Sequence, residues 1–288
     1  MKRMLLYLCA NLPALATAQS NEASLLKDQH ITHTSVYLGP VLVATERYDR
    51  AGNTIVSWDD SFLTETIQHS STQQFNAQNQ IISSKSTHSA MQDTTFWQYH
   101  YNERRQLTFV TDGYTGKQVQ LLEYNAAGQL VHKALLAPDG QPFSEERFTY
   151  DAKGHEVEAT IAGSGIAGRI KRTTYDQQGR PVKEQLLDQG KLFFTQLTQY
   201  QPTGEVRQVT YVEGRQTTGV EYTYDNNRRL LSRRHFKRTR GQNETTGLEE
   251  FTYTPTGLLA TFAEDIFSFG HTKRTFTYQY KKNLYLSV

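Results

Sequence analysis

The sequence predicts an all-β protein made of tandem antiparallel β-hairpins, about 20 strands in all. Two observations predict it. An aromatic residue followed by a turn-forming run recurs about every 26 residues, and the flanking segments alternate apolar and polar residues. The composition agrees, since 17 Tyr and 14 Phe accompany a mean hydropathy of −0.64. Because Tyr, Phe and Thr favour strands, we expect a sheet with one wetted face.

The chain begins with the pattern of an export signal. Two basic residues precede an apolar run over residues 4–15, and the small residues Ala16 and Ala18 stand before Gln19. The run is shorter than the about 20 residues that a membrane-spanning helix needs. We therefore expect cleavage between Ala18 and Gln19. The expected parts are a signal peptide (1–18), an N-terminal lead-in (19–30) and a repeat domain (31–288).

Cleavage at this point changes what the composition implies. The single cysteine, Cys9, leaves with the signal, so we expect a mature protein without disulfides. Two of the 31 Lys and Arg, namely Lys2 and Arg3, leave as well, and the remainder balance the 29 Asp and Glu. A net charge of zero gives no reason to expect nucleic acid as a partner.

The recurring unit is an aromatic anchor followed by Asp or Asn and, three positions later, by Gly. Asp or Asn at the first turn position can accept a hydrogen bond from its own backbone two residues on. Gly at the fourth position adopts a positive φ without steric cost, as a type I turn with a G1 bulge requires. The anchors and turn residues are Tyr48-Asp49-Gly52, Phe75-Asn76-Asn79, Tyr101-Asn102-Arg105, Tyr124-Asn125-Gly128, Tyr150-Asp151-Gly154, Tyr175-Asp176-Gly179, Tyr200-Gln201-Gly204, Tyr224-Asp225-Arg228, Tyr253-Thr254-Gly257 and a worn copy at Tyr280.

The flanks of each turn have the period of strands. Phe148 and Tyr150 share one face, while Arg147 and Thr149 take the other. A second turn, such as Pro138-Asp139-Gly140, closes each unit at its opposite end. Each period therefore supplies two antiparallel strands, and no long helix is expected.

These units resemble YD repeats, the repeats of rearrangement-hotspot (Rhs) and teneurin-like proteins. The resemblance extends from about Ile31 to Tyr280 and is closest over residues 124–228. It implies repeats that stack into a long sheet wrapping as a shell, often around a toxin cargo. This chain is far shorter than a full shell and has no recognisable core segment or toxin region, so we do not expect the cargo function. MORN-type repeats are shorter and richer in Gly than this period.

Geometry limits how such a sheet can be arranged. Twenty strands at about 4.8 Å each give a width of about 96 Å, which must curl, fold or split. A circular closure would be about 30 Å across and would leave a lumen that side chains cannot fill. We therefore expect one long curled or flattened sheet, with inner faces that meet over an aromatic core, and its partial closure stays open.

The motifs that suggest chemistry are weak here, and we expect no metal, no cofactor and no enzyme. The glycines at 163, 165 and 168 match G-x-G-x-x-G, but a dinucleotide site needs a helix after them, and a strand is expected instead. His30 and His33 have no third ligand nearby. The recurring turn aspartates are explained by turn chemistry, and no G-x-S-x-G nucleophile motif occurs.

One strong charge cluster stands out near the C-terminal end of the repeats. On a hairpin, alternate members would form a basic stripe that could attract a polyanion. The alternative is a solvated edge whose charges oppose aggregation. The cluster contains Arg228, Arg229, Arg233, Arg234, His235, Lys237, Arg238 and Arg240.

These observations favour a secreted or cell-envelope scaffold or binding protein without catalytic activity. Its location would be periplasmic, on the cell surface or extracellular, and its partner an envelope polysaccharide or another protein. An outer-membrane β-barrel is the alternative, because an even number of strands with one apolar face would fit it. A glycan-active hydrolase is a third reading. The sequence does not reveal the ligand, the oligomeric state or whether the sheet closes.

Overall fold

The computed structural model describes residues 24–61, 67–88, 93–163, 166–266 and 272–282. It confirms the all-β prediction, since its 20 strands are antiparallel and follow one another in hairpin order. The strands are β1 (Ile31–Leu38), β2 (Val41–Tyr48), β3 (Thr54–Ser61), β4 (Ile67–Phe75), β5 (Ile81–His88), β6 (Asp93–Tyr101), β7 (Leu107–Asp112), β8 (Gln118–Tyr124), β9 (Leu130–Leu136), β10 (Pro142–Tyr150), β11 (Glu156–Gly163), β12 (Ile166–Tyr175), β13 (Pro181–Asp188), β14 (Lys191–Tyr200), β15 (Val206–Glu213), β16 (Gln216–Tyr224), β17 (Leu230–Thr239), β18 (Gln242–Tyr253), β19 (Leu259–Ile266) and β20 (Thr272–Lys282).

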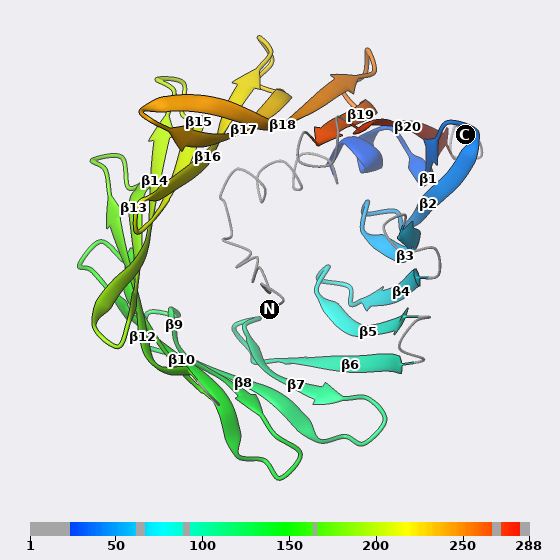
Figure 1. Ribbon diagram of the computed structural model, residues 1–288. Coiled ribbons are helices and arrows are strands. Elements are labelled where there is room, and N and C mark those ends of the chain that lie inside the picture. Colours follow the sequence, from blue (N-terminus) through cyan, green and yellow to red (C-terminus); the bar gives the residue numbers. More distant parts are fainter. Residues whose placement is uncertain (1–23, 62–66, 89–92, 164–165, 267–271, 283–288) are drawn as a thin grey trace.

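The sheet closes into a barrel, because the last strand pairs with the first. Tyr37 of β1 lies opposite Thr277 of β20, and the ladder continues along both strands (Figure 1). Closure pairs the backbone N–H and C=O groups that both edge strands would otherwise expose.

The expectation that the inner faces meet over an aromatic core was wrong. The main contacts between strands are all between hydrogen-bonded neighbours, so opposite walls of the barrel do not pack together. At about 30 Å across, side chains from opposite walls are too short to meet. The backbone groups of the two edge strands, β1 and β20, are paired with each other. The sheet therefore needs no packing between its opposite walls to cover its edges.

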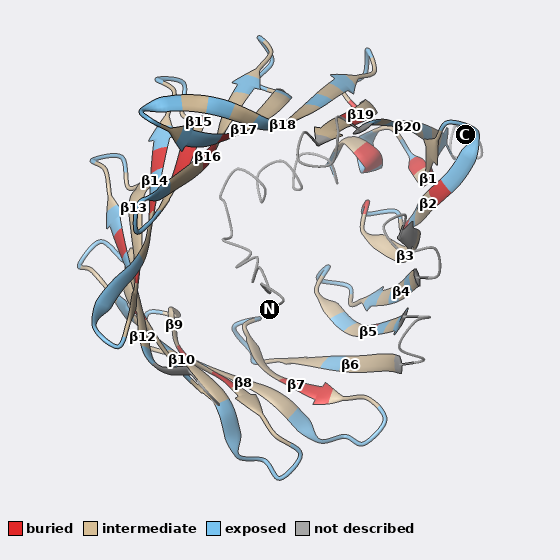
Figure 2. Ribbon diagram, viewed as in Figure 1, coloured by how far each residue is buried: buried red, intermediate tan, exposed pale blue. Residues whose placement is uncertain are grey.

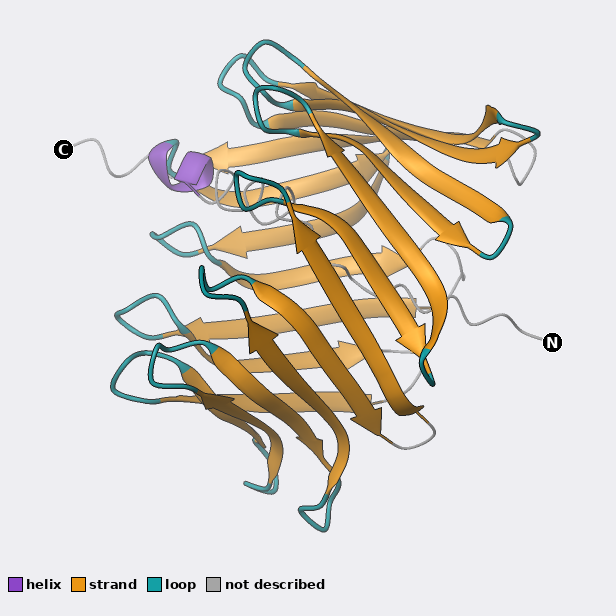
Figure 3. Ribbon diagram, turned by 90° about the vertical axis from the view of Figure 1, so that its left-hand side faces the viewer, coloured by secondary structure: helices purple, strands orange, loops and turns teal. Residues whose placement is uncertain are grey.

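The turns gather at the two ends of the barrel (Figure 3). One end, which we call the Tyr–Asp rim, holds the recurring turns of residues 49–52, 76–79, 102–105, 125–128, 151–154, 176–179, 201–204, 225–228 and 254–257. The other end, the distal rim, holds the described turns at residues 39–40, 113–117, 137–141, 189–190, 214–215 and 240–241. Every strand therefore runs from one rim to the other.

The anchor tyrosines point into the barrel. Residues 24–28 form a helical turn at the Tyr–Asp end of the barrel, within the outline of the ring in Figure 1, and Leu26 packs there against Ile31, Tyr48 and Leu258, with Tyr280 beside them. Because side chains alternate along a strand, the residues that share a face with these tyrosines form the inner face of the wall, and the others form the outer face.

The wall is a single layer, and this limits how much it can bury. Figure 2 shows buried residues scattered around the ring between long stretches of intermediate exposure. The largest fully buried side chains of the described residues are Phe236, which lies over Gly219, and Val209. Stability therefore comes mainly from contacts between neighbouring strands and at the rims. No helix among the described residues is long and apolar enough to cross a bilayer.

Candidate functional site

The Tyr–Asp turns are built by local hydrogen bonds. In the turn after β10, the N–H of Gly154 donates to the carbonyl of Asp151 at 3.0 Å, and Asp151 Oδ1 accepts from the N–H groups of Lys153 and His155. The fourth turn residues lie in the left-handed region, with φ of 83° at Gly128, 87° at Gly154, 77° at Gly179 and 101° at Gly204. Asn79, Arg105 and Arg228 adopt the same conformation.

The anchor tyrosines join consecutive turns along the rim. The hydroxyl of Tyr150 donates to the carbonyl of Leu130 at 2.7 Å, and that of Tyr224 donates to the carbonyl of Val206 at 3.0 Å. Each acceptor is at or next to the first residue of the preceding strand. Burial raises the pKa of Tyr224 to about 12. The same bond is made by Tyr101, Tyr124, Tyr150, Tyr175, Tyr200, Tyr224, Tyr253 and Tyr280.

A second recurring pair links the first turn residue to the residue four positions later. Where the first residue is Asp, the partner is a donor, as in Asp225, which accepts from Arg229 Nε at 2.7 Å. Where it is Asn, the partner is Gln, as in Asn125 and Gln129. The pairs are Asp49–Asn53, Asn76–Gln80, Asn102–Gln106, Asn125–Gln129, Asp151–His155, Asp176–Arg180 and Asp225–Arg229.

These partner residues also reach the next repeat. The His155 ring stacks on Tyr175 with centroids 4.7 Å apart, and the guanidinium of Arg180 lies 4.4 Å from the Tyr200 ring centre. Gln106 Nε2 donates to the carbonyl of Gly128 at 2.9 Å. The turn residues therefore hold successive hairpins in register, which is a structural role.

The inner face is polar along β11 to β14, whereas along β18 to β20 it carries the stacked rings of Phe251, Phe262 and Phe276. Lys171 Nζ pairs with Glu156 at 2.8 Å, and Gln196 Nε2 donates to Glu184 at 2.9 Å. Burial raises the pKa of the Glu184 carboxyl. Such a face suits water or a polar ligand in the lumen.

The densest group on the inner face spans β16 to β18. Glu249 pairs with Arg233 at 2.5 Å and with His235 Nε2 at 2.8 Å, and the Arg233 guanidinium lies over the ring of Phe251. Burial raises the pKa of the neighbouring Tyr222 to about 12. Sequence reasoning missed this group, because Glu249 becomes its centre only through the pairing of β17 with β18.

The basic stretch at residues 228–240 is divided between the two faces and the two rims. Arg228 and Arg229 pair with Glu205 and Asp225 at the Tyr–Asp rim. Arg233 pairs with Glu249 on the inner face, and Arg234 pairs with Glu221 on the outer face. Arg228 is exposed despite its ion pair, and the other exposed cations of the stretch are Lys237, Arg238 and Arg240, near the distal turn between β17 and β18. Polyanion binding by this stretch stays a prediction.

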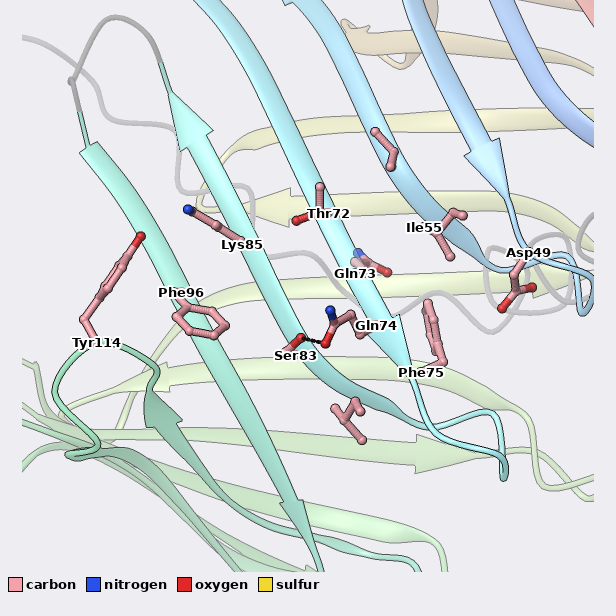
Figure 4. A pocket seen from close by; sticks show the side chains of 12 residues that line it. Asp49, Ile55, Thr72, Gln73, Gln74, Phe75, Ser83, Lys85, Phe96 and Tyr114 are labelled. Atoms are coloured by element: carbon pink, nitrogen blue, oxygen red, sulfur yellow. Dashed lines mark hydrogen bonds between the residues drawn. The ribbon is translucent and has the colours of Figure 1, made fainter.

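An open groove of about 820 Å³ lies on the barrel wall and extends over the strands β3 to β6 (Figure 4). It is lined by polar side chains such as Thr72, Gln74 and Lys85, and the aromatic rings of Phe96 and Tyr114 stand at one end. The two rings meet edge to face with centroids 5.5 Å apart. The groove could hold a polar ligand, but no group in it has a geometry that indicates a reaction.

The structure describes only part of the remaining sequence motifs, which are the glycine motif, the signal peptide and the candidate metal ligands. The glycine motif leads into the strand Ile166–Tyr175, and Ser164 and Gly165 lie outside the described residues. The expected signal peptide and its cleavage site at Ala18 and Gln19 also lie outside them. Within the described part of the chain, no three His, Cys, Asp or Glu side chains gather in a way that could hold a metal ion.

Comparisons with known proteins give distant similarities. No protein-family model and no curated protein matches the chain. A crystal structure of a porin-like protein from Bacteroides uniformis ATCC 8492 aligns over 87% of this chain and 98% of its own, with 11% identity and a TM-score of 0.40. A structure of TcdB2-TccC3-Cdc42 aligns over 77% of this chain but 18% of its own, with 12% identity and a TM-score of 0.22. At these TM-scores neither similarity carries an argument about function.

Proposed function

We propose that this protein is an exported β-barrel that acts in water as a scaffold or binding surface of the cell envelope or exterior, without catalytic activity. The observation that supports this most is that both faces of the wall have charged side chains at mid-height. On the inner face Lys171 pairs with Glu156, and on the outer face Arg172 pairs with Glu158 at 2.9 Å.

The neighbouring strands extend this argument. The outer face also contains Arg147, opposite Thr160, and Lys183, opposite Thr174. A Lys or Arg on the lipid face of a membrane barrel costs about 2–4 kcal/mol near the bilayer midplane. A wall with charges on both faces is therefore more stable in water than in lipid.

The second candidate is an outer-membrane barrel, and the closure of the sheet favours it. A strand edge cannot remain unpaired in hydrocarbon, and here β1 and β20 leave no edge open. The number of strands is even, as in bacterial outer-membrane barrels. The charged outer face is the observation against it.

We also propose that the chain is a short member of the YD-repeat group. The support is the recurring anchor tyrosine, its turn with a residue in the left-handed region, and the shift of register beside the tyrosine, as between Thr149 and Tyr150. The barrel described here would then be a reduced form of the shell that longer members build.

Cell fractionation tests the function proposed first. We expect osmotic shock or the culture medium to yield the mature protein without detergent, as a monodisperse species. Retention in the outer-membrane pellet until detergent is added would contradict the proposal and favour the membrane barrel. Measurable turnover of a glycan substrate would contradict the absence of catalytic activity.

A further inference from the structure

The distal rim exposes large apolar side chains at the tips of its hairpins. Leu192, which follows the Gln189-Gly190 turn, is 58% exposed, and Tyr114 in the turn after β7 is 60% exposed. Turn tips that face water are ordinarily polar. Within the described segments of this rim, the exposed large apolar residues are Val41, Leu42, Tyr114, Phe143, Leu192 and Phe193.

The same rim is rich in exposed cations. The part of the basic stretch at Lys237, Arg238 and Arg240 lies beside the turn between β17 and β18. Exposed basic residues also stand at Lys117, Lys191 and Arg215. Among the rim residues whose exposure the structure describes, the exposed carboxylates are fewer, namely Asp139, Glu213 and Glu244.

We propose that the distal rim docks onto an anionic lipid bilayer, with its apolar tips in the interface and its cations against the headgroups. This proposal rests on the proposed function, in which the barrel wall is surrounded by water. The barrel would then bind the membrane surface through its distal end, without crossing the bilayer. Apolar side chains enter the boundary between headgroups and acyl chains, and Lys and Arg near the surface are attracted to anionic lipids.

The spacing of the tips favours a bilayer over a protein partner. The apolar residues are separated around the barrel end, on the hairpins β1–β2, β7–β8, β9–β10 and β13–β14. A protein interface needs a contiguous, well-packed patch. A fluid bilayer can accept separate protrusions, because lipids rearrange around each one.

Vesicle co-sedimentation tests the proposal. The mature protein, first shown to stay soluble without detergent, is mixed with vesicles of phosphatidylcholine alone or with a third phosphatidylglycerol. We expect at least tenfold stronger binding to the anionic vesicles, weakening as salt is raised. Replacement of Leu192 and Phe193 by Ser should reduce binding about tenfold. Replacement of Lys237, Arg238 and Arg240 by Gln should reduce binding to the anionic vesicles and flatten the salt dependence.

The opposite rim supplies matched controls. Ile82 and Leu231 are both 39% exposed near the Tyr–Asp rim, and their replacement by Ser should leave vesicle binding unchanged. Equal losses from both rims, or no binding to anionic vesicles by a soluble protein, would overturn the proposal. Circular dichroism and melting of each variant separate lost binding from lost folding. A protein that is insoluble without detergent would instead contradict the proposed function, before any vesicle is added.

Discussion

The hydroxyl of Tyr175 donates a 2.7 Å hydrogen bond to the main-chain carbonyl of Glu156, across the hairpin formed by β11 and β12. The bond joins the last residue of one strand to the first residue of the strand before it. The anchor tyrosines from Tyr101 to Tyr280 repeat it, and each ties the end of its strand to the Tyr–Asp turn before it. The anchor tyrosine is therefore a connection between repeats as well as an apolar side chain.

Removing this hydroxyl should have a measurable cost. We expect Tyr175→Phe to lower the free energy of unfolding by about 0.5–1.5 kcal/mol, because one hydrogen bond is lost. Tyr175→Ala should cost about 2–4 kcal/mol, since the ring contacts are lost too. Urea unfolding measures both. Tyr114→Phe, at an exposed ring, is the control and should change stability little; an equal effect there would refute the role given to the anchor hydroxyl.

The turn glycines provide a second test. Gly154 has a φ of 87°, and a Cβ there would lie 3.2 Å from Gln129 Nε2. We expect Gly154→Val to destabilise the fold by about 1–3 kcal/mol, because a β-branched residue is strained at positive φ. Gly154→Asn should cost less, since Asn79 occupies the equivalent position with a φ of 65°. Equal costs for Val and Asn, measured by thermal unfolding, would show that the backbone conformation is not the cause.

Most features of these turns could be predicted from the sequence. The anchor, the first turn residue and the glycine recur at fixed spacing, and this predicted the strands, the hairpin order and the turn positions. The pairing of Asp225 with Arg229 was also present in the sequence, as a match of acid with donor and of Asn with Gln at the fourth residue on. No single residue type marks this position, because Asn, Gln, His and Arg all supply the partner.

The closure of the sheet and the ion pairs on its faces could not be predicted, because they depend on which strands become neighbours. Closure brings β1 beside β20, more than 230 residues away along the chain, and no local pattern specifies it. The position of Glu249 between Arg233 and His235 follows from a register shift within the β17–β18 pair. The sequence left two readings of the basic stretch open, a stripe formed by its alternate members and a solvated charged edge. Its ion pairs divide Arg233 and Arg234 between the two faces of the wall, and polyanion binding stays a prediction.

Acid should weaken the turns that contain Asp. The backbone hydrogen bond from Arg229 and the guanidinium beside it hold the pKa of Asp225 below its ordinary value. Because the folded-state pKa is depressed, this stabilisation is present above about pH 4 and is lost as the pH falls through the folded pKa. We expect Asp225→Asn to lower the melting temperature at pH 7 but much less near pH 2. Asn125→Ala, at a neutral copy of the position, should have an effect independent of pH; the same pH dependence in both variants would contradict this assignment.

Export predicts a defined mature terminus. We expect the secreted protein to begin at Gln19, in part cyclised to pyroglutamate, because Ala16 and Ala18 form a signal-peptidase site. Mass spectrometry of the N-terminal peptide decides it. A protein that keeps Met1, or that remains in the cytoplasm, would remove the basis for the envelope location.

Chemical labelling of the two wall faces tests the central claim, that both meet water, most directly. Lys171 and Arg172 are adjacent in β12 and point to the inner and outer faces, and the single cysteine of the chain is Cys9 in the expected signal. Lys171→Cys and Arg172→Cys therefore each give one label site in the mature protein. Each variant is treated with a charged maleimide that does not enter lipid, without detergent and in whichever cell fraction contains the mature protein. We predict rapid labelling of both; labelling of Lys171→Cys with protection of Arg172→Cys until detergent is added would show a lipid-facing outer wall and contradict the account.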